Sequence, residues 1–318
     1  MAAADLPELS AGVWGVAVVA ACAEVGLVER LREPAGLEAL ADGAGLSPAL
    51  AERLLDVLVV MGLAERRGRL YAATPELAQR SPALLAADGA ATLLQAADLV
   101  RRAAAGDLVA EGWRHTDPAV LQAQGTMSAG AVPFLERHVF PSAPGIPERL
   151  TSGAAFLDVG AGVAAVSIEL CRRFPRLRAV GLEPAEAPLA LARRNVEAAG
   201  LGDRVELRRQ LVQELDDAEA FDIAWLPLNF LPHDVIPVAL ARIHRAMRPG
   251  GLLLLATLGG GAGDLRSAAA RLRSVLWGGG DPIEPQRVAA LLEAAGFADI
   301  TVGDRMATSL VPLSARRR

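Results

Sequence analysis

Apolar residues in the first sixty positions recur at the three- and four-residue steps of a helix. The stretch 11–31 is strongly apolar on one side, and Ser10 stands where it can cap that helix. A short helix is expected near 37–42. Ser47 and Pro48 mark the start of a third helix, and Gly62 can close it in a left-handed conformation.

A hairpin is predicted directly after these helices. Residues 63–74 fit a hairpin with Arg67 and Gly68 at the turn and with Leu70 and Tyr71 in the returning strand. Helices followed by a hairpin predict a winged-helix domain for residues 1–80.

From residue 154 onward, short apolar runs alternate with segments of helical spacing. Strands are predicted at 154–159, 178–182, 204–209, 221–226 and 252–257, and helices at 164–174, 188–199, 235–247 and 285–295. The last two runs, 300–302 and 309–313, suit an antiparallel pair. This order predicts an α/β fold with a doubly wound, mostly parallel, seven-stranded sheet over residues 151–318.

Between these two parts, residues 81–150 alternate helical segments with proline and glycine. Large apolar and polar side chains are interleaved there, which is typical of a small-molecule pocket and also of an ordinary interdomain helix. The candidate acceptor contacts are Trp113, Gln124, Met127 and Phe134.

The composition fits this division, because 318 residues with 52% hydrophobic content are enough for about two domains with buried cores. The formal net charge is −5, and residues 1–100 carry seven arginines against thirteen acids. The third helix has Arg53 as its one cation, whereas a recognition helix needs polar and basic side chains toward the bases. We therefore expect no nucleic-acid partner. The apolar faces instead predict a homodimer formed through the N-terminal domain. That domain is expected to be all-α apart from its hairpin.

Cysteine content and apolar runs indicate a soluble cytoplasmic protein. Cys22 and Cys171 are too far apart for a disulfide framework or a metal motif, so no metal is expected. The apolar run 12–23 follows Asp5 and Glu8 instead of the basic residues of a signal peptide. No apolar stretch is expected to reach the roughly 18 residues of a membrane span.

The first predicted strand of the sheet carries the clearest chemical signal. It ends in Asp158 and leads through Gly160 and Gly162 into a helix, an arrangement that directs backbone amides toward a ligand. Glu183 follows the next strand and can accept hydrogen bonds from both hydroxyls of a ribose. Together they predict a nucleoside-containing cofactor.

The segments FLDVGAG, VGLEP, FDIAWLPLNFLP and RPGGLLLLAT follow one another behind the predicted winged helix. In this order the chain resembles class I S-adenosylmethionine-dependent methyltransferases, specifically the dimeric small-molecule O-methyltransferases of bacterial secondary metabolism. The resemblance implies S-adenosyl-L-methionine as cofactor and S-adenosylhomocysteine as product. The residues that it places at the cofactor are Asp158, Gly160, Gly162, Ala164, Glu183, Pro184, Gln210, Leu211, Trp225 and Leu226.

Three positions depart from the pattern of that family. Ala164 replaces a third glycine, and Leu211, beside Gln210, replaces an aspartate that reads the adenine amino group. Asn229 stands where plant-type relatives have the general-base histidine. The base is therefore open: His233 is the first candidate, with His115 and His138 behind it, because histidine titrates near working pH. Asn229 also remains a candidate for contact with the acceptor.

The leading hypothesis is methyl transfer to a hydroxyl, or to an amine or carbon, of a small natural product. The three departures favour, as an alternative, a cyclase, pericyclase or isomerase on the same fold. A ligand-sensing winged-helix regulator is the non-enzymatic alternative. A nicotinamide-dependent dehydrogenase ranks low, because one tyrosine and no lysine leave no Tyr–Lys pair.

Overall fold

The computed structural model describes residues 5–108, 113–258, 264–304 and 310–318. These residues form two compact units. Of the described residues, the first unit contains 5–108 and Gln122–Met127, and the second contains the others. The division of the chain at residues 80 and 150 stays a prediction.

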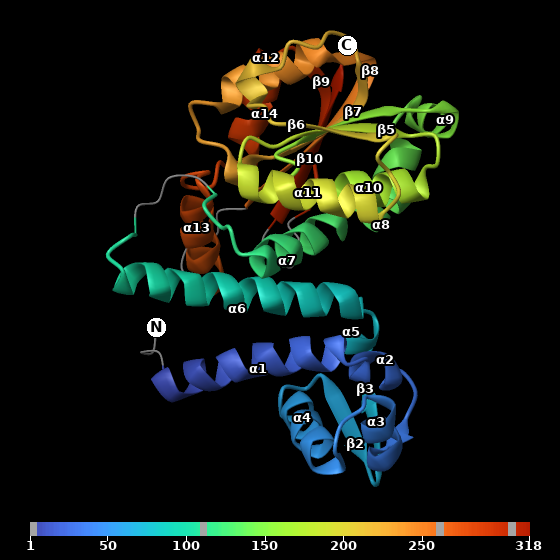
Figure 1. The fold of residues 1–318 in the computed structure, drawn as a ribbon, viewed down its shortest axis with the longest axis vertical. Coiled ribbons are helices and arrows are strands. Elements are labelled where there is room, and N and C mark those ends of the chain that lie inside the picture. Colours follow the sequence, from blue (N-terminus) through green and yellow to red (C-terminus); the bar gives the residue numbers. More distant parts are fainter. Residues whose placement is uncertain (1–4, 109–112, 259–263, 305–309) are drawn as a thin grey trace. The chain divides into compact units, whose positions relative to one another are not determined.

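The first unit consists of helices and a small antiparallel sheet (Figure 1). Strands β1 (Ala35–Gly36), β3 (Leu70–Ala73) and β2 (Ala64–Arg67) lie in the order β1-β3-β2. The predicted hairpin is confirmed, because Ala64 pairs with Ala73 and Arg67 pairs with Leu70. The helices are α1 (Leu6–Glu24), α2 (Leu27–Arg30), α3 (Leu37–Gly43), α4 (Pro48–Val60), α5 (Pro75–Ala78) and α6 (Pro82–Ala104). The elements are those of a winged helix, and the assignment to that class stays a prediction.

The start and end of the first helix were wrong in the sequence prediction. Helix α1 begins at Leu6 behind Asp5, not behind Ser10, because a proline in the first turn needs no partner for its missing N–H. Gly26 has a φ of 76° and separates α1 from α2. The start of α4 is as expected, since the Ser47 hydroxyl accepts a hydrogen bond from the Leu50 amide at 3.3 Å.

Two helices of this unit are long and apolar enough to cross a membrane by length and composition alone. They are α1, with 19 residues, and α6, with 23. The expectation that no apolar stretch reaches this length was therefore wrong. Because the two helices pack against each other within the unit, part of their apolar surface is already covered by protein.

The second unit is built on a seven-stranded sheet with the order β6-β5-β4-β7-β8-β10-β9. Its strands are β4 (Ala155–Val159), β5 (Arg178–Leu182), β6 (Val205–Arg208), β7 (Phe221–Pro227), β8 (Met247–Leu258), β9 (Phe297–Val302) and β10 (Leu310–Arg317). Neighbouring strands are parallel from β6 to β8, and β10 is antiparallel to both β8 and β9. The predicted fold class is confirmed for this unit.

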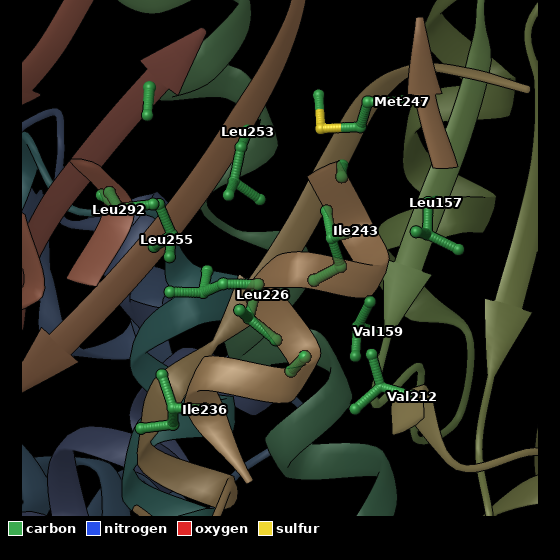
Figure 2. Packing of buried hydrophobic residues seen from close by; sticks show 14 of the residues in the cluster. Leu157, Val159, Val212, Leu226, Ile236, Ile243, Met247, Leu253, Leu255 and Leu292 are labelled. Carbon is green, nitrogen blue, oxygen red and sulfur yellow. The ribbon is translucent and has the colours of Figure 1, made fainter. Parts of the chain in front are cut away.

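Helices cover both faces of the sheet (Figure 1). One face packs against α12 (Ile236–Ala246) and α14 (Pro285–Ala294), with Leu157, Leu226 and Leu255 in the core between them (Figure 2). The other face packs against α10 (Ala165–Arg173) and α11 (Glu186–Ala198). Strands buried on both faces are largely apolar, which explains why these runs were predicted from sequence.

The second part of the chain contains further helices. Helix α7 is Pro118–Ala129, α8 is Val132–Phe134, α9 is Ile146–Ser152 and α13 is Leu265–Trp277. A single π-helical turn, Leu135–Val139, follows α8. Helix α13 was missed from sequence, although Asp264 caps it by accepting a hydrogen bond from the Ser267 amide at 2.7 Å.

The predicted turn at 248–251 lies inside a strand. In the register of β7 and β8, Phe221 pairs with Met247 and Ile223 already pairs with Leu252. The residues between them on β8 therefore loop out as a bulge, with Gly250 at a φ of 73°.

The buried carboxylate of Asp222 holds this bulge and the start of β4. Its oxygens accept hydrogen bonds from Arg149 at 3.0 Å, from Arg248 at 2.6 Å and from the Ala155 amide at 2.8 Å. Arg149 also donates to the carbonyl of Pro249 at 2.9 Å. Asp222 thus joins three segments at the amino edge of the sheet.

Replacing Asp222 by alanine should lower the free energy of unfolding by about 2 kcal/mol or more, because three charge-assisted bonds are lost together. Urea unfolding monitored by circular dichroism measures this loss. Glu293→Gln, at an exposed position on α14, is the control and should change the midpoint little. An Asp222→Ala midpoint equal to that of the control would contradict this role.

Candidate functional site

The chain reverses its direction of winding at β4. From β4 it proceeds outward to β5 and β6, and it then returns to the other side of β4 to form β7 and β8. In such sheets the connections on the two sides leave a crevice at the carboxyl ends of the two central strands. The turns that follow β4, β5 and β7 therefore form the candidate site.

The turn after β4 has an unusual backbone. Gly160, Gly162 and Ala164 all have positive φ, at 69°, 55° and 62°. Ala164 is fully buried and serves as the N-cap of α10. An L-residue in this conformation costs on the order of 1–2 kcal/mol, so the departure from glycine at Ala164 stores strain at the candidate site.

Glu183 ties the turn after β4 to the turn after β5. One oxygen of its carboxylate accepts from the Gly162 amide at 3.0 Å, and the other accepts from the Ala185 amide at 2.9 Å. Burial raises the pKa of Glu183, and the two amide bonds oppose that rise. Each carboxylate oxygen can accept more than one hydrogen bond, so Glu183 keeps the capacity to bind the two hydroxyls of a ribose.

Asp158 ends β4 and is almost completely buried. Its carboxylate accepts a hydrogen bond from the Ser167 hydroxyl of α10 at 2.6 Å. Desolvation raises the pKa of Asp158 to about 6, and the hydrogen bonds from Ser167 oppose the rise. A cationic ligand at this edge would lower that pKa again, because it would stabilise the ionised form.

The segment after β6 is closed by its own side chains. Gln210 donates from Nε2 to the Glu214 carbonyl at 2.9 Å, and the Glu214 carboxylate accepts from the Leu211 amide at 3.1 Å. Leu211 is 44% exposed. At this position the chain therefore presents an apolar side chain in place of the expected aspartate, which would form hydrogen bonds.

Two expected cofactor residues on β7 lie on opposite faces of the sheet. Trp225 pairs in register with Asp158 and lies against the core on the α10 side. Leu226 is fully buried in the core on the α12 side. Pro184 directly follows Glu183 and is exposed.

Asn229 lies in a short 3-10 turn, Leu228–Phe230, that directly follows β7. Its side chain is buried, and Oδ1 accepts a hydrogen bond from the Leu258 amide at the end of β8, at 3.0 Å. Gly279 lies against the same turn, since a Cβ built on it would come within 2.4 Å of the Asn229 carbonyl oxygen. Only glycine allows this close approach.

His233 is exposed and holds the neighbouring loop. Its Nε2 lies 2.8 Å from the Asp281 carbonyl oxygen. Because a carbonyl can only accept, Nε2 carries the proton and Nδ1 is left as the basic nitrogen. His233 therefore follows the 3-10 turn that contains Asn229, but its Nε2 is already hydrogen-bonded to the Asp281 carbonyl.

An aromatic cluster adjoins Asn229. Phe230 stacks on Trp277 with a centroid distance of 4.9 Å, and Trp113 contacts both rings edge-on. His115 contacts Trp113 at 4.5 Å. Trp113 and His115 are thus brought to the site, while Phe230 and Trp277 were missed from sequence because only tertiary contact brings them together.

The remaining candidates lie on other elements. Gln124 and Met127 belong to the first unit, where Gln124 is bonded to Gln95 at 3.3 Å. His138 is exposed on the π-helical turn and contacts Phe134 at 5.0 Å. Among the described residues, no three histidine, cysteine or carboxylate side chains form a group that could hold a metal ion.

Part of the second unit is similar in sequence to known methyltransferases. Residues 156–251 match the family model described as a methyltransferase domain. A ubiquinone biosynthesis O-methyltransferase of Rhodopseudomonas palustris (strain BisB5) is 33% identical over 110 residues, which are 34% of this chain and 41% of that protein. The chain thus matches less than half the length of this curated relative.

Two solved structures resemble nearly the whole chain. Human N-acetylserotonin methyltransferase in complex with SAM has a TM-score of 0.62 at 19% identity, covering 100% of this chain and 99% of that one. The mitomycin 7-O-methyltransferase MmcR has a TM-score of 0.59 at 22% identity, with 98% and 97% covered. At these identities the likeness concerns the fold. The resemblance to class I methyltransferases is confirmed at the level of the fold, and residues 156–251 match a methyltransferase domain.

The raised pKa of Asp158 predicts a pH-dependent stability. Its pKa in the folded protein is about 6, above the ordinary value of 3.8, so the folded state binds the proton more tightly. The ionised carboxylate therefore destabilises the fold above pH 6, and this penalty disappears as the pH falls toward 4.

Asp158→Asn should raise the free energy of unfolding at pH 7 by on the order of 1–3 kcal/mol, because the amide resembles the protonated acid. The gain over the wild type should vanish near pH 4. Chemical unfolding of both proteins without ligand at pH 4, 5, 6 and 7 measures it. A difference that does not change with pH would contradict a titrating Asp158.

Proposed function

We propose that this chain is an S-adenosylmethionine-dependent methyltransferase that methylates a hydroxyl of a small natural product. The observation that carries the proposal is the pair of carboxylates, Asp158 and Glu183, at the reversal point of a methyltransferase-type sheet. The amine or carbon of such a product is the less favoured acceptor. A cyclase, pericyclase or isomerase on this fold stays the alternative.

The residues present suit this cofactor. Its methionine part carries an ammonium group and a sulfonium, and the desolvated carboxylate of Asp158 complements positive charge. Glu183 has two acceptor oxygens for the ribose hydroxyls. Leu211 offers an exposed apolar side chain for the adenine ring, with Gln210 beside it.

Methyl transfer depends mainly on how the acceptor is positioned. The methyl group on a sulfonium is already activated, so holding the acceptor oxygen in line and excluding water supplies much of the acceleration. Trp113 and the aromatic side chains around it are the proposed acceptor wall. Gln124, Met127 and Phe134 stay predicted acceptor contacts. His233, His115 and His138 are the proposed bases for an acceptor that arrives protonated.

Titration calorimetry with S-adenosylhomocysteine tests the cofactor site. Glu183→Gln should weaken binding about tenfold or more, which corresponds to about 1.4 kcal/mol, because one acceptor of the ribose hydroxyls becomes a donor. Glu197→Gln, exposed on α11, should bind as the wild type does.

The outcomes separate the candidate functions. Absence of binding to both S-adenosylmethionine and S-adenosylhomocysteine would contradict the proposal. Binding of the cofactor with a product of unchanged mass would favour the cyclase, pericyclase or isomerase, since methylation adds one CH2.

We also propose that the chain acts as a cytoplasmic homodimer joined through its first unit. On α1, Leu6, Val13 and Trp14 are 74%, 56% and 72% exposed, and Val60 at the end of α4 is 88% exposed. Apolar surface of this extent is typical of an interface with protein or membrane.

Light scattering after size exclusion should give twice the mass of the chain, and Trp14→Asp should shift it toward the monomer. The variant Leu265→Asp changes an equally exposed apolar residue of the other unit and should leave the mass unchanged. A monomeric wild type that sediments with vesicles would instead indicate that α1 faces a membrane.

A further inference from the structure

We propose that the acceptor is bound with its oxygen already ionised, so that the substrate is an acidic hydroxyl, such as an electron-poor phenol or an enol. This inference rests on the proposed methyl transfer and specifies its substrate class. It is based on the fixed side-chain amide of Asn229 in the turn after β7.

Asn229 is placed beside the reversal point by the sheet register. Asp158 pairs with Trp225 in the parallel ladder of β4 and β7, and β7 ends two residues later at Pro227. The 3-10 turn with Asn229 therefore begins at the same edge as the glycine turn. Asn229 is the one buried asparagine of the described residues.

The orientation of the Asn229 amide is set by its partner. The Leu258 amide can only donate, so the atom 3.0 Å from it is Oδ1, and Nδ2 is the other end. Close packing of Gly279 on the Asn229 backbone holds the turn in place. An amide nitrogen donates hydrogen bonds but takes no proton, so at this position the protein offers a donor and no base.

The titratable groups near this turn serve other contacts. His233 donates to the Asp281 carbonyl on the loop over the turn, and His115 lies against Trp113. On α13, the Arg273 guanidinium lies 4.9 Å from the Trp277 ring centroid. Asp264 caps the same helix, and Asp158 is bonded to Ser167.

A fixed donor in apolar surroundings stabilises an oxygen that carries negative charge more than a neutral hydroxyl. Phe230, Trp113 and Trp277 pack with Leu258, whose amide donates to Asn229, and they supply those surroundings. In the transfer step, a lone pair of the oxygen forms the O–C bond while the C–S bond of the methyl donor breaks. The electron pair of that bond stays on sulfur, the opposite charges cancel, and no proton moves in this step.

The proposal is tested by binding alone, with 4-nitrophenol as the probe and S-adenosylhomocysteine present so that no turnover occurs. The absorbance of the nitrophenolate reports ionisation directly. We expect the pKa of the bound phenol to be at least one unit below that of the free phenol, a tenfold preference for the anion. Asn229→Asp keeps the acceptor for Leu258 and replaces the donor by a carboxylate, so it should abolish the shift.

Asn229→Ala gives a second measurement if the aspartate variant is unstable, and Glu197→Gln should retain the full shift. A bound phenol with an unchanged or raised pKa, or no binding of the phenol, would overturn the inference. The same holds if Asn229→Asp retains the shift while His115→Gln or His233→Gln removes it, because a histidine would then accept the proton. Failure of the proposed function would be seen separately, as loss of S-adenosylhomocysteine binding.

Discussion

The candidate site depends on the two hydrogen bonds that the Glu183 carboxylate accepts. The carboxylate accepts one hydrogen bond from each of two turns, through the amides of Gly162 and Ala185. These turns follow neighbouring strands, so one side chain fixes the distance between the end of β4 and the end of β5. The positive φ values of Gly160, Gly162 and Ala164 become tolerable because this contact and the packing of α10 hold the turn.

The amino edge of the sheet contributes to stability, and the carboxyl edge carries the candidate site. At the amino edge, Asp222 is fully compensated by Arg149, Arg248 and a backbone amide. At the carboxyl edge, Asp158 is buried with Ser167 as its side-chain partner, and burial raises its pKa. A positively charged ligand stabilises most strongly a carboxylate that is costly to ionise in the free protein. The cost of ionising Asp158 is therefore linked to binding of the proposed cofactor.

The sequence was sufficient to predict the sheet, because strands buried on both faces are short apolar runs that differ sharply from their surroundings. The glycine turn and Glu183 were predicted for the same reason, since each directly ends such a run. Sequence was not sufficient for Phe230 and Trp277, which are joined only by tertiary contact. The role of Asn229 could not be predicted either, because its partner Leu258 is 29 residues away and the bond depends on the register of β8. The ends of α1 were misjudged, since Ser10 is a good cap in isolation but Asp5 precedes a first turn that contains Pro7 and starts the helix equally well.

A crystal structure of the protein grown with S-adenosylhomocysteine tests the central claim most directly. The account predicts density for the ligand at the carboxyl ends of β4 and β5, with the ribose hydroxyls within hydrogen-bonding distance of the Glu183 carboxylate and the methionine part beside Gly160 and Gly162. Density at another place on the chain, or a Glu183 carboxylate that contacts only its two backbone amides while the ligand is bound, would contradict it.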